Sequence, residues 1–321
     1  MKKLKLLVLA GLMLFAMPAK ADLAPTVMLH HGGQVKTYMY YEVQKAVDDA
    51  VDGDTIFLSN GSFQPFNVNK RILVKGAGYS TLIDGSCVID IPGTDKLNMP
   101  VLDALTFNGD IQVNNAYKQF TLRKCSMINL IFSEEGGKEF YDVKIDRCEI
   151  KSRLNLPNNV IEFNAFNSKI YTFYPHDYSG YSMFEHCNIG KTCAHITGGI
   201  FNSCVIGPAT KFSDAKDYSN MIGCVLNSCY YCSYNQPLLN CTVVNCRYYI
   251  SSTNNYNEFY NFNDDAQLYV SALDGTKMGA YGGQHPFNRN PEAPGVTKHE
   301  ISIDAATRTM TVKLTVDKLD K

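Results

Sequence analysis

Hydrophobic positions recur with a period near 20 residues through the middle of the chain, and one small residue marks each repeat. Taking this residue as position zero, the residues three before and two after it are apolar in all seven repeats from 120 to 246. Successive zero positions are 17 to 23 residues apart. A repeat of this length predicts a stack of equivalent coils. The zero positions are Cys125, Cys148, Ser168, Cys187, Cys204, Cys224 and Cys241.

Within each repeat the spacing predicts a strand, a tight corner and a second strand. Positions zero and plus two lie on one face of a strand, whereas the step from minus three to zero does not fit strand alternation. A corner residue at minus one, such as Asn167, explains the break, because Asn and Gly tolerate the left-handed conformation. Stacked coils then pair in parallel about 4.8 Å apart. Leu105 extends the pattern by one coil towards the N-terminus, and Cys87 is a candidate for another.

The segments on either side of the repeats predict a cap and a tail. Residues 22–35 read as an irregular lead-in, and residues 41–50 place their apolar side chains on one helical face. A helix there would cover the exposed end of the stack. After three prolines, Ile301–Ile303 and Met310–Val316 alternate between apolar and polar residues, which predicts a terminal hairpin.

Three phrases resemble a known family. They are Gly53-Asp54-Thr55-Ile56-Phe57-Leu58 after the helix, Asn240-Cys241-Thr242-Val243, and the segment from Asp274 to Gly283. They look like exported right-handed parallel β-helix proteins of the pectate-lyase-like superfamily, of the type common in Bacteroidetes, over residues 37–290. The resemblance implies an all-β fold: a single-stranded right-handed parallel β-helix of about ten coils, with an N-terminal capping helix and a short C-terminal β tail. It implies no single activity, because this fold hosts many functions.

The first 21 residues predict a secretory signal peptide. Lys2, Lys3 and Lys5 precede an apolar stretch too short to span a bilayer, and Ala19-Lys20-Ala21 is a small-residue cleavage site. The expected domains are therefore a leader at 1–21, a capped β-helix at 22–290 and a hairpin tail at 291–321. No later segment reads as a membrane span. The expected location is outside the cytoplasm, either secreted, at the cell surface or periplasmic.

The charge of the processed chain disfavours nucleic acid as a partner. Without the four lysines of the leader it carries 26 basic and 31 acidic residues, and it has no basic tract. The oligomeric state stays open.

The chain has 11 cysteines, which in an exported protein usually indicate disulfides. Here the register favours a buried ladder, since stacked side chains point the same way rather than toward each other. Cys229 and Cys246 both follow a ladder cysteine by five residues and are candidates for a disulfide. A zinc site around Cys229 and Cys232 has no nearby histidine, so no metal is predicted. Calcium is a candidate at Asp264 and Asp265, but no motif supports it.

Charged residues near the corners are candidates for catalysis. The register brings Lys124, Arg147 and His186 into one column. Glycoside hydrolysis needs two carboxylates, and lyases of the superfamily use a base with cationic neutralisation of a uronate. The alternative is an ordinary solvated face. The candidate catalytic residues are Asp146, Arg147, Glu149, Glu185 and His186.

Tyrosines concentrate near the last coils, among Asn, Ser and Gln. Aromatic rings stack on the apolar faces of sugars, and amides bind their hydroxyls, so the cluster is a candidate glycan-binding site. The alternative is a packed flank or an interface. The candidates are Tyr230, Tyr231, Tyr234, Tyr248 and Tyr249.

Three functions follow from these features. The first is an exported or surface β-helix protein that contacts polysaccharide or cell-surface glycan without a clear catalytic signature. The second is a polysaccharide lyase or glycoside hydrolase acting on an acidic polysaccharide. The third is a structural or adhesive surface protein. No cofactor is expected for the first.

Overall fold

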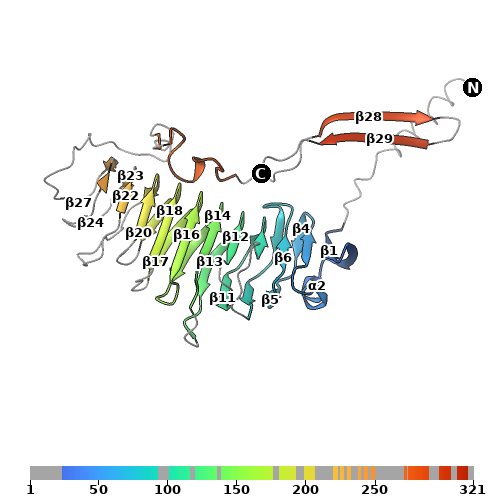
Figure 1. Ribbon diagram of the computed structural model, residues 1–321, viewed down its shortest axis with the longest axis horizontal. Coiled ribbons are helices and arrows are strands. Elements are labelled where there is room, and N and C mark those ends of the chain that lie inside the picture. Colours follow the sequence, from blue (N-terminus) through green and yellow to red (C-terminus); the bar gives the residue numbers. More distant parts are fainter. Residues whose placement is uncertain are drawn as a thin grey trace, which may run out of the picture.

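The chain folds into an elongated parallel β-solenoid in a computed structural model (Figure 1). The structure describes residues 24–92, 101–115, 120–135, 139–175, 181–192, 199–206, 271–272 and 274–288. It also describes the backbone of 220–222, 225–227, 230–232, 238–239, 242–244, 247–249, 296–304 and 309–316. The expected leader at 1–21 lies outside the described residues.

Two sheets run along the solenoid and each coil contributes to both. In the first sheet, ten described strands from β3 to β25 pair in parallel, one coil after the next. They are β3 (Thr55–Leu58), β6 (Leu73–Lys75), β9 (Leu102–Asp103), β12 (Thr121–Arg123), β14 (Val143–Asp146), β16 (Glu162–Phe166), β18 (Tyr181–Glu185), β20 (Gly199–Asn202), β22 (Asn220–Ile222) and β25 (Leu238–Leu239).

The second sheet follows the corner of each coil and also pairs in parallel. Its strands are β4 (Gly61–Phe63), β5 (Asn67–Val68), β7 (Thr81–Ile83), β8 (Cys87–Asp90), β10 (Thr106–Phe107), β11 (Ile111–Asn115), β13 (Ser126–Phe132), β15 (Glu149–Leu156), β17 (Lys169–Pro175), β19 (Asn188–Thr192), β21 (Val205–Ile206), β23 (Val225–Asn227) and β26 (Thr242–Val244). Two further strands, β24 (Tyr230–Cys232) and β27 (Arg247–Tyr249), pair in a small sheet of their own.

The corner between the two sheets is a single residue in the left-handed conformation, as the repeat predicts. Its φ angles lie between 46° and 58° in six successive coils. The predicted parallel solenoid is confirmed, but its regular part is about six turns long, shorter than the ten coils expected. The corner residues are Ala104, Lys124, Arg147, Asn167, His186 and Ser203.

After the five corners from Lys124 to Ser203, the next residue donates a side-chain hydrogen bond as well as filling the core. The Cys125 thiol reaches the Arg123 carbonyl at 3.3 Å, and the Cys204 thiol reaches the Asn202 carbonyl at 3.2 Å. Ser168 makes the same contact, with its hydroxyl 2.7 Å from the Phe166 carbonyl. Serine therefore replaces cysteine here because the site offers a carbonyl acceptor.

Burial keeps these thiols neutral. Loss of solvation raises the pKa of Cys148 to about 12, and burial also raises the pKa of Cys125 and Cys87. The five cysteines whose side chains are described are free and buried, and four of them, Cys125, Cys148, Cys187 and Cys204, fit the predicted ladder. Cys87 is not part of it, because it pairs with Ile111 rather than standing in register with Leu105.

The N-terminal cap contains more structure than the sequence predicts. Residues expected as an irregular lead-in form β1 (Thr26–His31) and β2 (Gln34–Met39), which pair in an antiparallel hairpin. Gly32 and Gly33 turn the chain with φ angles of 54° and 80°, as a two-residue hairpin loop requires. β1 also pairs antiparallel with β3 and so covers the edge of the first coil.

The predicted capping helix is present as α2 (Val43–Asp49), which buries Val43, Ala46 and Val47. The predicted terminal hairpin is also present, as β28 (Val296–Asp304) paired antiparallel with β29 (Thr309–Val316). No helix in the described part of the chain has the length and hydrophobicity of a membrane span.

We predict that Phe184→Ala lowers the free energy of unfolding by about 3–5 kcal/mol, because its ring is fully buried. It stacks on Phe201 with centroids 4.8 Å apart and contacts Phe173 at 5.1 Å. Urea unfolding followed by circular dichroism measures the change. Tyr181→Ala is the matched control, since Tyr181 lies on the same strand but is 46% exposed. Equal destabilisation by the two variants would contradict this account of the core.

Candidate functional site

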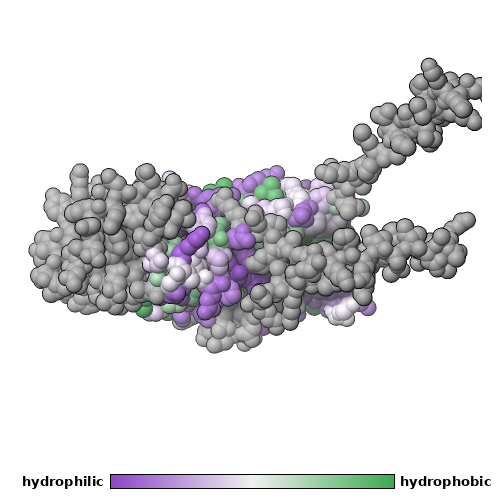
Figure 2. Space-filling model, turned by 90° about the horizontal axis from the view of Figure 1, so that it is seen from above, coloured by the Kyte–Doolittle hydropathy of each residue, from purple (hydrophilic) through white to green (hydrophobic). Residues whose placement is uncertain are grey.

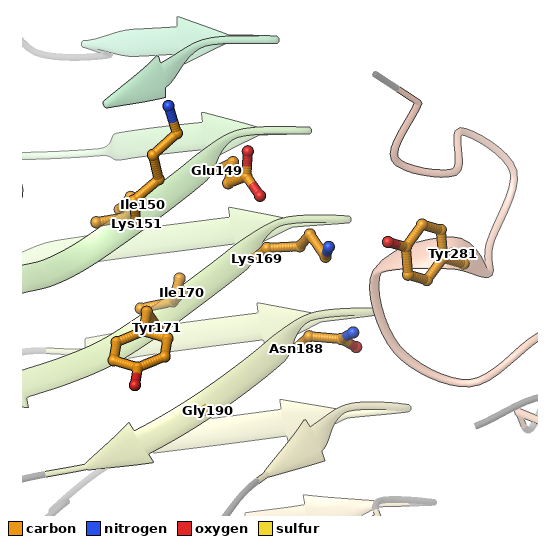
Figure 3. A pocket seen from close by; sticks show the side chains of 9 residues that line it. All are labelled: Glu149, Ile150, Lys151, Lys169, Ile170, Tyr171, Asn188, Gly190 and Tyr281. Atoms are coloured by element: carbon orange, nitrogen blue, oxygen red, sulfur yellow. The ribbon is translucent and has the colours of Figure 1, made fainter. Parts of the chain in front are cut away.

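A groove of about 590 Å³ lies on the outer face of the second sheet (Figure 3). Its floor comes from three neighbouring strands, β15, β17 and β19, and Tyr281 lies at its far side on the short 3-10 helix η3 (Gly279–Tyr281). The lining residues are Glu149, Ile150, Lys151, Lys169, Ile170, Tyr171, Asn188, Gly190 and Tyr281. One of the predicted catalytic residues, Glu149, is among them.

The polar side chains of the floor stand in one column along the solenoid. Glu149 pairs in register with Lys169, and Lys169 with Asn188, so the three lie on successive coils about 4.8 Å apart. Glu149 is only 8% exposed, and its carboxylate accepts a hydrogen bond from the Ser126 hydroxyl at 3.4 Å. Along the solenoid axis, the floor therefore presents a carboxylate, then an ammonium group, then a side-chain amide.

Two residues further along each strand the groove is lined by Lys151, Tyr171 and Gly190, although the register of β15 and β17 shifts between Ile150 and Arg153. Tyr171 is 67% exposed, the highest value among the exposed large hydrophobic side chains of the described residues. A Cβ atom at Gly190 would lie 2.8 Å from the Tyr171 carbonyl oxygen, so glycine lets the two strands approach. The absence of a side chain also leaves one flank of the Tyr171 ring uncovered.

Residues 274–288, which we call the strap, run along the side of the solenoid and hold Tyr281 at the groove. The side-chain amide of Asn167 donates a hydrogen bond to the Gly282 carbonyl at 2.5 Å. The backbone amide of Gly279 donates to the Ser203 carbonyl at 3.0 Å. The Ala280 amide donates to the Asn188 side chain at 3.0 Å. The strap is thus fixed to two corner residues and to one residue of the groove floor.

Aromatic contacts complete the attachment. Lys169 Nζ lies 5.1 Å from the Tyr281 ring centroid and 5.3 Å from that of Phe287, within range of cation–π attraction. The two rings meet edge to face at 6.0 Å. Lys169 therefore belongs both to the floor of the groove and to the seat of the strap.

His186, a predicted catalytic residue, lies beneath the strap instead of facing the groove. Its Nε2 atom is 3.1 Å from Asp274 Oδ2, and its side chain is 5% exposed. Its Nδ1 atom makes no hydrogen bond to the described residues. A Cβ atom at Gly282 would come within 2.8 Å of that nitrogen, so the strap packs closely on the ring.

The pKa of Asp274 is lowered by its partners. Partial burial acts to raise it, but hydrogen bonds from the Thr276 hydroxyl at 2.7 Å and amide at 3.0 Å, together with His186, outweigh that effect. The Gly283 amide donates to the same Thr276 hydroxyl at 2.6 Å. The ionised form of Asp274 is therefore the one that organises this end of the strap.

The other predicted catalytic residues do not converge on the groove. Asp146 and Arg147 are neighbours in the chain and pair with each other, with Arg147 Nη2 2.9 Å from Asp146 Oδ2. Glu185 stands two coils beyond Asp146 on the same column of the first sheet, with Phe166 between them. None of the three lines the groove, so the expected patch divides into separate contacts.

The same column carries an alternating ladder of charges towards the N-terminus. Asp103 is 2% exposed and pairs with Arg123 through two hydrogen bonds of 3.1 and 2.7 Å. Lys75 Nζ lies 4.0 Å from the same carboxylate. The register places Lys75, Asp103, Arg123 and Asp146 on successive coils, which puts opposite charges on adjacent strands. This part of the charged face is structural.

The tyrosine cluster is described only in its backbone. β24 and β27 run in parallel, with Tyr230 opposite Arg247 and Cys232 opposite Tyr249, so the pairs Tyr230/Tyr231 and Tyr248/Tyr249 come from neighbouring strands. Tyr234, Cys229 and Cys246 lie outside the described residues, as do Asp264 and Asp265. In the part of the chain that the structure describes, no three His, Cys, Asp or Glu side chains group as metal ligands.

Several groove residues were not identified from the sequence, although the repeat contains the signal. Lys169 and Asn188 occupy the position one after zero, and Tyr171 occupies the position three after it. Strand alternation points both positions outward. Aligning the outward positions of the repeats, as well as the inward ones, predicts that these residues lie side by side in the groove floor. Tyr281 has no such signal, because the repeat does not say which coils a later segment contacts.

The surface around the strap is predominantly hydrophilic where it is described. Figure 2, which views the molecule from above, shows only small separate hydrophobic areas there. Comparison with known proteins finds no matching family model, no matching curated protein and no matching solved structure. The site must therefore be interpreted from its own geometry.

Attachment of the strap should weaken in acid. A carboxyl with a lowered pKa in the folded state stabilises that state above its unfolded pKa, near 3.8, and loses this effect as the pH falls through the folded value. We predict that the Ala280 and Gly283 amides exchange hydrogen slowly at about pH 5 and faster, after correction for intrinsic rates, below about pH 3.

Asp274→Asn is the control for this experiment, because it removes the titrating group and leaves an amide of similar shape. The variant should exchange faster than the parent at about pH 5 and change less on acidification. Equal pH dependence in the two proteins would show that another group governs the strap.

Proposed function

We propose that this protein is an exported β-solenoid that binds a glycan in the groove between the second sheet and the strap, without cleaving it. The observation that carries the proposal is the arrangement of the two tyrosines. Tyr171 is 67% and Tyr281 44% exposed, and they lie on opposite sides of a polar floor (Figure 3). Aromatic rings bind the apolar faces of sugars, while the amide and charged groups between them suit sugar hydroxyls.

The expected leader peptide and the resemblance to pectate-lyase-like β-helix proteins support an extracellular, cell-surface or periplasmic location. An elongated solenoid with an outward groove along its length suits a linear polymer better than a small metabolite. The hydrophilic surface near the strap also agrees with a polar partner (Figure 2).

The distribution of carboxylates favours binding over hydrolysis. Hydrolysis of a glycosidic bond uses two carboxyl groups that flank it. Among the described residues lining the groove, Glu149 supplies one carboxylate. Asp146 is paired with Arg147, and Glu185 belongs to the other sheet. The hydrolase alternative therefore has one carboxylate where it needs two, and the assay for unsaturated products tests the lyase alternative.

A binding and turnover screen tests the proposal. Residues 22–321 are titrated calorimetrically with cellohexaose, xylohexaose and polygalacturonate, and each mixture is assayed for reducing ends and for unsaturated products. Saturable binding without products is expected. Product formation would replace the proposal with the enzyme alternative. No binding to any of the three would favour a structural role.

We predict that Tyr171→Ala weakens binding of the best ligand about tenfold, the loss expected when a stacking aromatic is removed. Tyr181→Ala removes a tyrosine that is 46% exposed on β18, outside the groove, and should leave the Kd within about twofold. Calorimetry measures both values. Similar losses in the two variants would place the binding site elsewhere.

A further inference from the structure

The strap holds Tyr281 at the groove through hydrogen bonds of the two residues next to it. Of its residues, Tyr281 alone is among those lining the groove. The residues immediately before and after it are both attached to the solenoid, Ala280 through its amide to Asn188 and Gly282 through its carbonyl to Asn167. The backbone of Tyr281 is therefore held on both sides, by residues of two neighbouring coils, while its side chain extends over the groove.

Two floor residues are shared between the groove and the strap. Asn188 lines the groove and accepts the Ala280 hydrogen bond, and Lys169 lines the groove and faces the Tyr281 ring. Any ligand that contacts these side chains contacts the groups that hold the strap. Ligand binding in the groove and docking of the strap therefore both involve the side chains of Lys169 and Asn188.

The fit of the strap depends on glycine at one position in particular. A Cβ atom at Gly279 would lie 2.0 Å from Asn188 Oδ1, and the residue has φ of +71°. Gly275, in the same strap, has φ of +78° but would find nothing within 4 Å. The two glycines share a backbone conformation and differ in what a methyl group would meet.

We propose that docking of the strap is coupled to ligand binding: the groove gains its second wall only when residues 274–288 are seated, and a bound ligand in turn holds the strap in place. His186 and Asp274 then serve as positioning residues, acting on the ligand through Tyr281. The proposal rests on glycan binding in the groove. By linkage, the factor by which a seated strap tightens ligand binding equals the factor by which bound ligand favours the seated strap.

Gly279→Ala and Gly275→Ala form a matched pair for testing this coupling. Each is made in a Tyr281→Trp background, where the chain, which otherwise has no tryptophan, gains a single fluorophore in the strap. Both alanines bear the strain of a positive φ, but Gly279→Ala alone collides with Asn188. Circular dichroism verifies that both variants retain the solenoid.

Gly279→Ala should show a red-shifted tryptophan emission without ligand. It should bind the best of cellohexaose, xylohexaose and polygalacturonate about tenfold or more weakly than Gly275→Ala. In the unsubstituted protein, the same ligand should slow hydrogen exchange at the Ala280 and Gly283 amides. Slowed exchange together with the affinity difference supports the coupling.

Three outcomes would overturn the inference, and they separate it from the function it rests on. Equal affinity of the two variants, with the emission of Gly279→Ala red-shifted, removes the coupling and leaves glycan binding intact. Unchanged exchange on ligand binding does the same. No binding of any probe to the unsubstituted protein removes both proposals together, even if the emission difference shows that the strap has moved.

Discussion

The single left-handed residue at each corner is the constraint on which the rest of the structure depends. It turns the chain from one sheet to the next without interrupting the backbone pairing between coils. The Lys124, Arg147 and Asn167 amides each donate to a carbonyl of the following coil at 2.8 to 3.0 Å. Because polar backbone groups are paired through the corner, the interior can be filled mainly by apolar side chains. The thiols that follow the corners add a second donor to the same carbonyls.

The sequence predicts this part of the fold well because each coil repeats the same order of strand, corner residue and buried positions. Three inward columns and a corner column, each read over several coils, are enough to define the sheet register. The N-terminal hairpin was missed for the opposite reason, since it occurs once. Its Gly32-Gly33 turn was a readable local signal, but the residues around it alternate weakly.

The candidate site is less predictable because it combines a repeated surface with a unique segment. The outward columns that contain Lys169 and Tyr171 follow from strand alternation. The strap does not, since its contacts with Asn167, His186 and Asn188 join residues about 90 to 115 positions apart. Charge gives a weaker guide: Asp146 and Arg147 were separate candidates from the sequence, and the structure pairs their side chains with each other.

The corner has a further consequence for how such a protein can change over evolutionary time. Its side chains point away from the core, and six different residue types occupy it in six coils, from alanine to histidine. A substitution there alters what the flank of the molecule presents while leaving the apolar columns untouched. Two side chains that hold the strap, those of Asn167 and His186, come from this column, whereas Ser203 holds it through its backbone carbonyl. The protein could therefore acquire, shift or lose a covering segment, and with it one wall of its groove, by exchanging residues that the fold itself scarcely constrains.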